Sequence, residues 1–124
     1  MVSKINLKPK VVDLFSGCGG LSFGLHEAGF DVVHDFGLGL AGSDEYVAVT
    51  PQRWGEIVWE NRRPEAEGYL LSCTNTTMIE VIEEAERRLA KPIVTSNQAV
   101  LWACLRKLNV TGSIEGLGRL FHQR

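Results

Sequence analysis

Short apolar runs alternate along the chain with longer segments in which apolar residues recur at helical spacing. Each run is four or five residues long and is bounded by glycine, proline or polar residues. Runs of this kind predict buried strands, whereas the longer segments predict helices. The expected strands cover residues 11–15, 30–33, 69–72 and 92–95.

The first predicted helix lies between the first two strands. Leu21, Leu25 and Ala28 fall on one of its faces, and Gly29 is a typical residue just beyond a helix C-terminus. After the second strand, residues 37–49 are glycine-rich and aperiodic, so we expect a loop there.

A second helix is predicted at Thr50-Pro51, where threonine suits the N-cap and proline the first helical position. It should end before Pro64 and bury Trp54, Ile57 and Val58. A third helix should follow the third strand and mark its inward face with Ile79, Ile82, Ala85, Glu86 and Leu89.

A fourth helix is expected after the last strand, capped by Asn97 and running to about Leu108. Its inward face should consist of Val100, Ala103, Cys104 and Leu108. The remaining tail, GSIEGLGRLFHQR, is expected to add a short strand or helix.

Strands that alternate with helices predict βαβ units and a parallel sheet. We therefore expect one α/β domain over residues 1–124. Its architecture should be a four-stranded parallel doubly wound sheet with strand order 2-1-3-4, of flavodoxin-like or Rossmann-like type. Ligands of such sheets bind beyond the carboxyl ends of the strands where the order reverses, here between strands 1 and 3.

Composition narrows the class of protein. The chain has 124 residues and a net charge of −2, so one domain is expected and nucleic acid is an unlikely partner. No apolar run is long enough for a membrane span, and three cysteines without a framework spacing suit a reducing cytoplasm. The three histidines are scattered, so we expect no metal site.

Cys73 is the first candidate for chemistry, because it follows the third predicted strand at or just before a helix start. Helix N-termini favour anions, and a thiol there serves as base, acid or nucleophile. Polar residues at the ends of two neighbouring strands would hold a substrate carboxylate: Thr74, Asn75, Thr76, Thr95, Ser96 and Asn97. The alternative is that these residues cap helices and that Cys73 fills a small space in the core.

The segments LSCTNTT, KPIVTSNQAVLW and GLGRLF resemble the C-terminal half of maleate cis–trans isomerases and arylmalonate decarboxylase-like proteins, in the aspartate/glutamate racemase superfamily. The resemblance covers about residues 26–124. It implies chemistry without a cofactor on a small dicarboxylate or a relative of one, using two thiols from two pseudo-symmetric halves. It assigns one thiol to Cys73 and places Asn75, Thr95 and Ser96 near the carboxylates.

The same resemblance matches Gly118 and Arg119 to a closing glycine-arginine segment, with Leu117 where the family usually has tyrosine. The half that carries the other thiol has no counterpart in the sequence. A second thiol would have to come from Cys18 or from a second chain.

A second motif, VVDLFSGCGGLSFGLHEAGF at 11–30, resembles the first motif of DNA cytosine-5 methyltransferases, which binds S-adenosylmethionine. The resemblance implies a cofactor pocket lined by Phe15, Ser16, Gly17, Cys18, Gly19 and Gly20. Asp35, at the end of the second strand, suits a ribose hydroxyl by its spacing from the glycines. The methyltransferase Pro-Cys nucleophile is absent, because Ser72 precedes Cys73.

We interpret the chain as a chimera in which a methyltransferase-like unit, residues 1–30, precedes a racemase-superfamily half, residues 31–124. Three functions stay open. The chain is an isomerase-like enzyme of small carboxylates acting through Cys73, an S-adenosylmethionine-binding fragment, or an inactive folded chimera that self-associates as a homodimer. Cys18 and Cys73 would also form a disulfide if their Cα atoms lay within about 7 Å.

Overall fold

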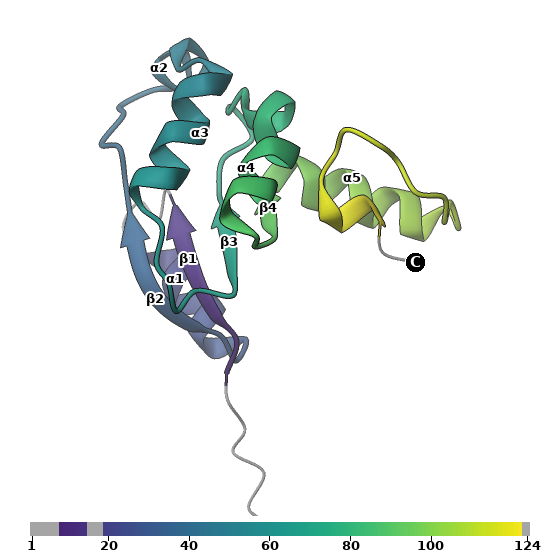
Figure 1. The fold of residues 1–124 in the computed structure, drawn as a ribbon, viewed down its shortest axis with the longest axis horizontal. Coiled ribbons are helices and arrows are strands. Elements are labelled where there is room, and N and C mark those ends of the chain that lie inside the picture. Colours follow the sequence, from purple (N-terminus) through teal and green to yellow (C-terminus); the bar gives the residue numbers. More distant parts are fainter. Residues whose placement is uncertain (1–7, 15–18, 123–124) are drawn as a thin grey trace, which may run out of the picture.

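The computed structural model describes residues 8–14 and 19–122. Within them the chain forms a four-stranded α/β layer structure (Figure 1). The first half contains β1 (Lys10–Leu14), α1 (Gly20–Glu27), β2 (Asp31–Phe36), α2 (Ser43–Ala48) and α3 (Pro51–Glu60). The second half contains β3 (Gly68–Leu71), η1 (Met78–Val81), α4 (Ile82–Leu89), β4 (Ile93–Thr95), α5 (Ser96–Lys107) and η2 (Arg119–His122), where η denotes a 3-10 helix.

All strand pairs of the sheet are parallel, and their order is β2-β1-β3-β4. This confirms the predicted fold class and strand order. The register aligns the last residue of every strand in one row: Phe36, Leu14, Leu71 and Thr95. The loops that leave the strands therefore start at the same level of the sheet.

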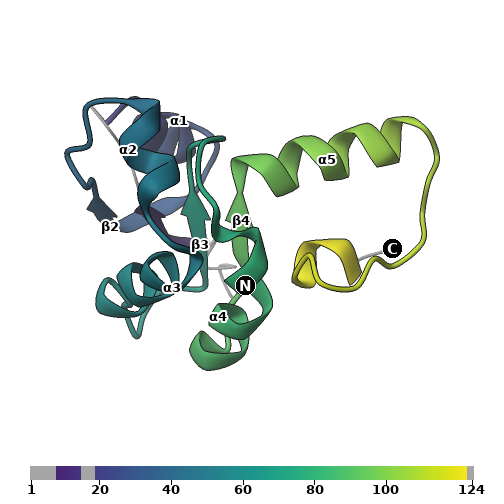
Figure 2. The ribbon, with the colours of Figure 1, turned by 90° about the horizontal axis from the view of Figure 1, so that it is seen from above.

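The core lies on one face of the sheet, where side chains point inward at every second strand position. The strand residues buried there are Val12, Leu14, Tyr69, Leu71 and Ile93. Helices α3 and α4 lie side by side over this face (Figure 2). They bury Trp54, Ile57, Val58, Ile82 and Ala85, which confirms the predicted inward residues of α3.

The start of α3 agrees with its sequence signal. The hydroxyl oxygen of Thr50 accepts the backbone N–H of Arg53 at 3.2 Å, and Pro51 is the first helical residue. The segment 37–49 was expected to be a loop, but α2 forms inside it. This helix is too short to show a periodic apolar face, and its Tyr46 ring stacks on Trp54 with centroids 6.4 Å apart.

The inward face predicted for the last helix is wrong. Val100, Ala103, Cys104 and Leu108 are all exposed, and Gln98 is the one buried residue of α5. Figures 1 and 2 show the reason, because α5 extends away from β4 instead of lying across the sheet. Periodicity reveals an apolar face but not what covers it, so the predicted homodimer stays a prediction.

The third predicted helix is also divided. Its first turn is the 3-10 helix η1, which turns Ile79 outward, and the α-helix begins only at Ile82. Buried Glu86 on α4 then accepts two backbone N–H groups, from Ile93 at 2.8 Å and from Arg119 at 2.8 Å. One carboxylate thus fixes both the start of β4 and the C-terminal segment.

No helix within the described residues has the length and apolar content needed to cross a membrane.

Gly118 is the tightest packed glycine of the described chain. Its φ is +79°, and a Cβ there would lie 2.7 Å from Ile82 Cγ2 and 3.0 Å from a carboxylate oxygen of Glu86. We expect Gly118→Ala to lower the free energy of unfolding by about 2–4 kcal/mol, because backbone strain and overpacking add. Urea denaturation measures this loss.

Gly116→Ala is the matched control, since Gly116 has a φ of +84° with no atom within 4 Å of the added Cβ. It should lower the free energy of unfolding only by the cost of the backbone strain, about 1–2 kcal/mol. Equal losses in the two variants would contradict close packing at Gly118.

Candidate active site

The ends of β3 and β4 bring the two predicted polar clusters together. Leu71 pairs with Thr95 in the sheet, so the residues that follow each strand lie next to each other. The backbone N–H of Cys73 donates to Ser96 Oγ at 3.2 Å, across 23 positions of sequence. The thiol of Cys73 is half-buried at this edge.

The turn that carries Cys73 is held by its own polar side chains. The backbone N–H of Asn75 donates to Cys73 Sγ at 3.4 Å, and Thr76 Oγ1 donates to the Cys73 carbonyl at 3.3 Å. From the other cluster, Asn97 Nδ2 donates to the Thr74 carbonyl at 3.0 Å. The side chains of Thr76 and Asn97 therefore position the turn, while Thr74 and Asn75 remain exposed.

The turn changes the expected setting of Cys73. Residues 74–77 separate the thiol from Met78, where the next helical turn begins, so the expectation of a helix N-terminus at Cys73 is wrong. The helix starts later than expected because residues 74–77, Thr-Asn-Thr-Thr, are polar residues that favour a turn. The N–H of Asn75, rather than a helix dipole, is the positive group beside the sulfur.

Thr95 has a structural position at the start of α5. Its hydroxyl oxygen accepts the N–H of Gln98 at 3.2 Å, and the Gln98 side chain accepts the N–H of Thr95 at 2.8 Å. This reciprocal pair is a capping box, so Thr95 and not Asn97 caps the helix. Thr95 is 2% exposed, which removes its side chain from the surface of the candidate site.

Gln98 is a residue that sequence reasoning did not assign. It is fully buried and its Nε2 donates to the carbonyl of Leu117 at 2.6 Å, which fastens the C-terminal segment beside the strand end. The signal was present, because glutamine three residues after threonine is a capping-box pattern. Arg119 next to Gly118 donates to the Ala90 carbonyl at 3.4 Å, at the far end of α4.

The glycine motif is only partly described. Phe15, Ser16, Gly17 and Cys18 lie outside the described residues, as does any pairing of Cys18 with Cys73. Gly19, with a φ of +87°, precedes Gly20 at the start of α1. Asp35 is exposed on β2, in register with Asp13 on β1.

Asp13 is a buried carboxylic acid in the middle of an apolar strand. One of its oxygens accepts the Ser22 hydroxyl at 2.6 Å, and the other has no partner among the described residues. Burial raises the pKa of Asp13, the Ser22 hydrogen bond opposes this, and the charge of Asp35 raises the pKa further. The sequence VVDLF already carried the signal of a polar residue at a core position.

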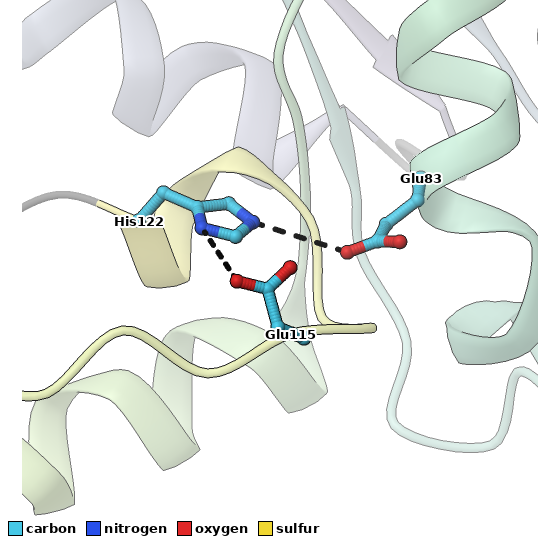
Figure 3. Close-up of side chains that lie close together, drawn as sticks. All are labelled: Glu83, Glu115 and His122. Atoms are coloured by element: carbon cyan, nitrogen blue, oxygen red, sulfur yellow. Dashed lines mark ion pairs between the residues drawn. The ribbon is translucent and has the colours of Figure 1, made fainter.

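One histidine, His122, lies in a cluster of polar side chains, although the three histidines are far apart in the sequence. His122 lies between two carboxylates, with its ring nitrogens 3.9 Å from Glu83 and 3.9 Å from Glu115 (Figure 3). Its Nδ1 also lies 2.8 Å from Ser113 Oγ, and Glu83 accepts the backbone N–H of Gly116 at 2.7 Å. All three clustered side chains are exposed, and the contacts join the C-terminal segment to α4.

Comparison with known proteins agrees with this arrangement. The arylmalonate decarboxylase family model matches residues 18–121, which is most of the chain. This chain belongs to the arylmalonate decarboxylase family. A curated arylmalonate decarboxylase from Bordetella bronchiseptica is 38% identical over 61 residues, covering 48% of this chain and 25% of that protein.

Solved structures of arylmalonate decarboxylase and maleate isomerase have the same fold. A glycine-to-cysteine variant of arylmalonate decarboxylase with associated sulfate is 26% identical, with a TM-score of 0.80 over 92% of this chain and 52% of that one. A maleate cis–trans isomerase variant from Nocardia farcinica, carrying a covalently bound succinylcysteine intermediate, is 18% identical. Its TM-score is 0.82 over 94% of this chain and 49% of that one. This chain thus spans about half the length of these solved relatives.

The arylmalonate decarboxylase family match leaves the chimera without support. Coverage of 92% by the arylmalonate decarboxylase structure leaves fewer residues outside the match than residues 11–30 contain. The strand and helix of this segment are thus at least partly shared with the family fold, and they do not require a methyltransferase origin.

Asp13 generates a pH-dependent prediction. Because its folded-state pKa is raised, the protonated acid stabilises the fold fully at low pH, and this contribution is lost as pH rises through the folded pKa. Asp13→Asn removes the charge, so it should raise the free energy of unfolding near neutral pH by on the order of 1 kcal/mol. The increase should be smaller near pH 4. Thermal unfolding at both pH values measures the difference.

Asp35→Asn serves as the control, because it removes a neighbouring negative charge from an exposed position. Its effect should be smaller. A gain from Asp13→Asn that is the same at both pH values would show that Asp13 does not titrate differently in the folded state.

Proposed function

We propose that this chain uses the Cys73 thiol, without a cofactor, in chemistry on a carbon next to a carboxylate of a small acid. The observation that carries the proposal is the half-buried sulfur at the shared end of β3 and β4, with Ser96 and the Asn75 N–H beside it. A thiol held at a strand edge with donors around it suits proton transfer or addition to carbon.

The activity of one relative and the bound group of another support this chemistry. One is an arylmalonate decarboxylase, and another holds a succinyl group on a cysteine sulfur. Both act on or carry small carboxylic acids. Because this chain covers about half of the solved relatives, its substrate and its turnover belong to the proposal.

Two reactions fit a single thiol at this position. On a malonate-type acid, the bond to one carboxylate breaks, carbon dioxide leaves, and the electron pair left on carbon takes the thiol proton. On a maleate-type acid, the thiolate sulfur bonds to one alkene carbon and the π electrons move to the other carbon. Rotation about the new single bond and breaking of the C–S bond then re-form the double bond and release fumarate, whereas a proton from solvent on the second carbon leaves a succinyl adduct on the sulfur. The exposed Thr74 and Asn75, which follow Cys73 in the chain, and the half-buried Ser96, which accepts its backbone N–H, are the polar side chains available for holding the remaining carboxylate.

S-adenosylmethionine binding is not carried further as a function. Four residues of its implied pocket lie outside the described residues, and the family match over residues 18–121 gives it no support.

The maleate reaction supplies the test of Cys73, because protonation of its intermediate leaves a succinyl group on the sulfur. The protein is incubated with maleate, and the cysteine peptides are followed by mass spectrometry. Although Cys104 is exposed and Cys73 only half-buried, Cys73 should gain one maleate mass several times faster. A built site predicts this order, whereas simple accessibility predicts the reverse.

Two variants complete the experiment. Cys104→Ser should leave Cys73 labelling unchanged, and Cys73→Ser should abolish fumarate formation from maleate and carbon dioxide release from an arylmalonate wherever the wild type shows them. Labelling of Cys104 at the same rate as Cys73 would sink the proposal. The Cys18 peptide is measured in the same digest.

Self-association of this chain is a separate part of the proposal. Val100 on α5 is 60% exposed and Leu108, directly after α5, is 73% exposed, and an apolar surface of this kind favours contact with a second copy. Sedimentation velocity should show a dimer that Leu108→Lys weakens. Val47→Lys, at a 53% exposed position on α2, should leave it intact. A monomeric wild type contradicts the expectation.

A further inference from the structure

A cavity of about 490 Å³ opens at the end of the sheet opposite Cys73. It lies between the C-terminal ends of α3 and α4 and the starts of β3 and β4. Its lining includes Trp59, Arg62, Arg63, Tyr69, Arg88 and Lys91. Four of these six side chains are cations, in a chain whose net charge is −2.

Two guanidinium groups of the cavity share one indole ring. The guanidinium carbon of Arg62 lies 4.2 Å from the Trp59 ring centroid, and that of Arg88 lies 4.6 Å from it. Each contact is an attractive cation–π interaction, but the two positive charges repel each other across the shared ring. An anion that contacts both guanidinium groups from the cavity would offset this repulsion.

The cations of the cavity have little anionic compensation. Arg88 makes no hydrogen bond or ion pair within the described part of the chain, although Glu84 stands one helical turn before it. Glu60 lines the cavity, but its carboxylate pairs with Arg53 at 2.8 Å. Lys91 likewise has no recorded partner among the described residues.

Tyr69 adds a buried donor to the same cavity. Its side chain is 4% exposed, and its hydroxyl oxygen accepts the backbone N–H of Arg63 at 3.1 Å. Among the described residues no acceptor receives the hydroxyl proton of Tyr69. Because Tyr69 lines the cavity, its hydroxyl can donate a hydrogen bond to an acceptor that enters it.

Helix C-termini favour cations, and this explains part of the pattern. The side chain of Arg62 donates to the carbonyl of Trp59 at 2.7 Å and so satisfies the end of α3. This preference also accounts for Arg88 in the last turn of α4, and cation–π attraction brings this side chain to the same indole. Two neighbouring guanidinium groups and the Tyr69 hydroxyl therefore share one cavity. Both features are those of a site that receives an oxyanion.

We propose that this cavity binds a small oxyanion with two or more negative charges, held by Arg62, Arg88, Lys91 and the Tyr69 hydroxyl. Phosphate-type and polycarboxylate ligands share this chemistry. The aromatic and proline lining of the cavity also leaves room for an apolar part of the ligand. The site is separate from Cys73, because it lies at the amino ends of β3 and β4 rather than at their carboxyl ends.

Isothermal titration calorimetry with pyrophosphate and with citrate tests the proposal. Binding of pyrophosphate alone, of citrate alone or of both supports it and identifies the class of anion. The double substitution Arg88→Gln with Lys91→Gln should weaken binding at least about tenfold, as expected for loss of charge-assisted hydrogen bonds. Binding should also weaken as salt is raised, because the site is open to solvent.

Arg106→Gln is the matched control, since Arg106 stacks on Trp102 at 5.2 Å on α5, outside the cavity. It should leave the dissociation constant within about twofold. Absence of binding by either anion, an unchanged constant in the double variant, or an equal loss in Arg106→Gln would overturn the proposal. Cys73→Ala should bind the anion as the wild type does, so failure here is distinguishable from failure of the thiol chemistry.

Discussion

The level at which the four strands end is the constraint on which the candidate site depends. Phe36, Leu14, Leu71 and Thr95 form one row across a parallel sheet, so every loop beyond them starts from the same edge. The hydrogen bond from the Cys73 N–H to Ser96 Oγ exists because of this row. A shift of β4 by one residue would move Ser96, which directly follows this strand, by about 3.3 Å along the strand direction and would remove the contact.

Buried polar side chains then fix what hydrophobic packing leaves free. Gln98 joins the end of β4 to Leu117, and Glu86 joins the start of β4 to Arg119. The C-terminal segment is thereby tied at both ends of one short strand. Because a buried donor or acceptor is costly when unpaired, these two side chains specify the path of the segment more strictly than apolar contacts would. Asp13 is the exception, because one of its oxygens has no partner among the described residues, and burial raises its pKa.

The fold could be predicted from the sequence because the patterns that mark strands and helix starts involve only neighbouring residues. Alternating apolar runs and the Thr50-Pro51 signal predict strands and a helix start that depend on neighbouring residues. Prediction failed where tertiary contacts decide. The apolar side of α5 is real, but the helix leaves the sheet, and α2 is too short to show a period. In the site, position along the chain identified Cys73 and Ser96, whereas the burial of Thr95, the hydrogen bond of Gln98 to Leu117 and the role of Thr76 depend on tertiary contacts.

The cation-lined cavity and the Cys73 turn lie at opposite ends of β3, and salt in the solvent weakens the electrostatic interaction between them. From Tyr69 to Cys73 the chain advances by four residues, which is about 13 Å in a strand. This exceeds the Debye length of about 8 Å at physiological ionic strength. An anion among Arg62, Arg88 and Lys91 would thus change the electrostatic potential at the Cys73 sulfur only weakly. Any influence of one end on the other must instead pass through β3 itself, whose Tyr69 and Leu71 are both packed in the core.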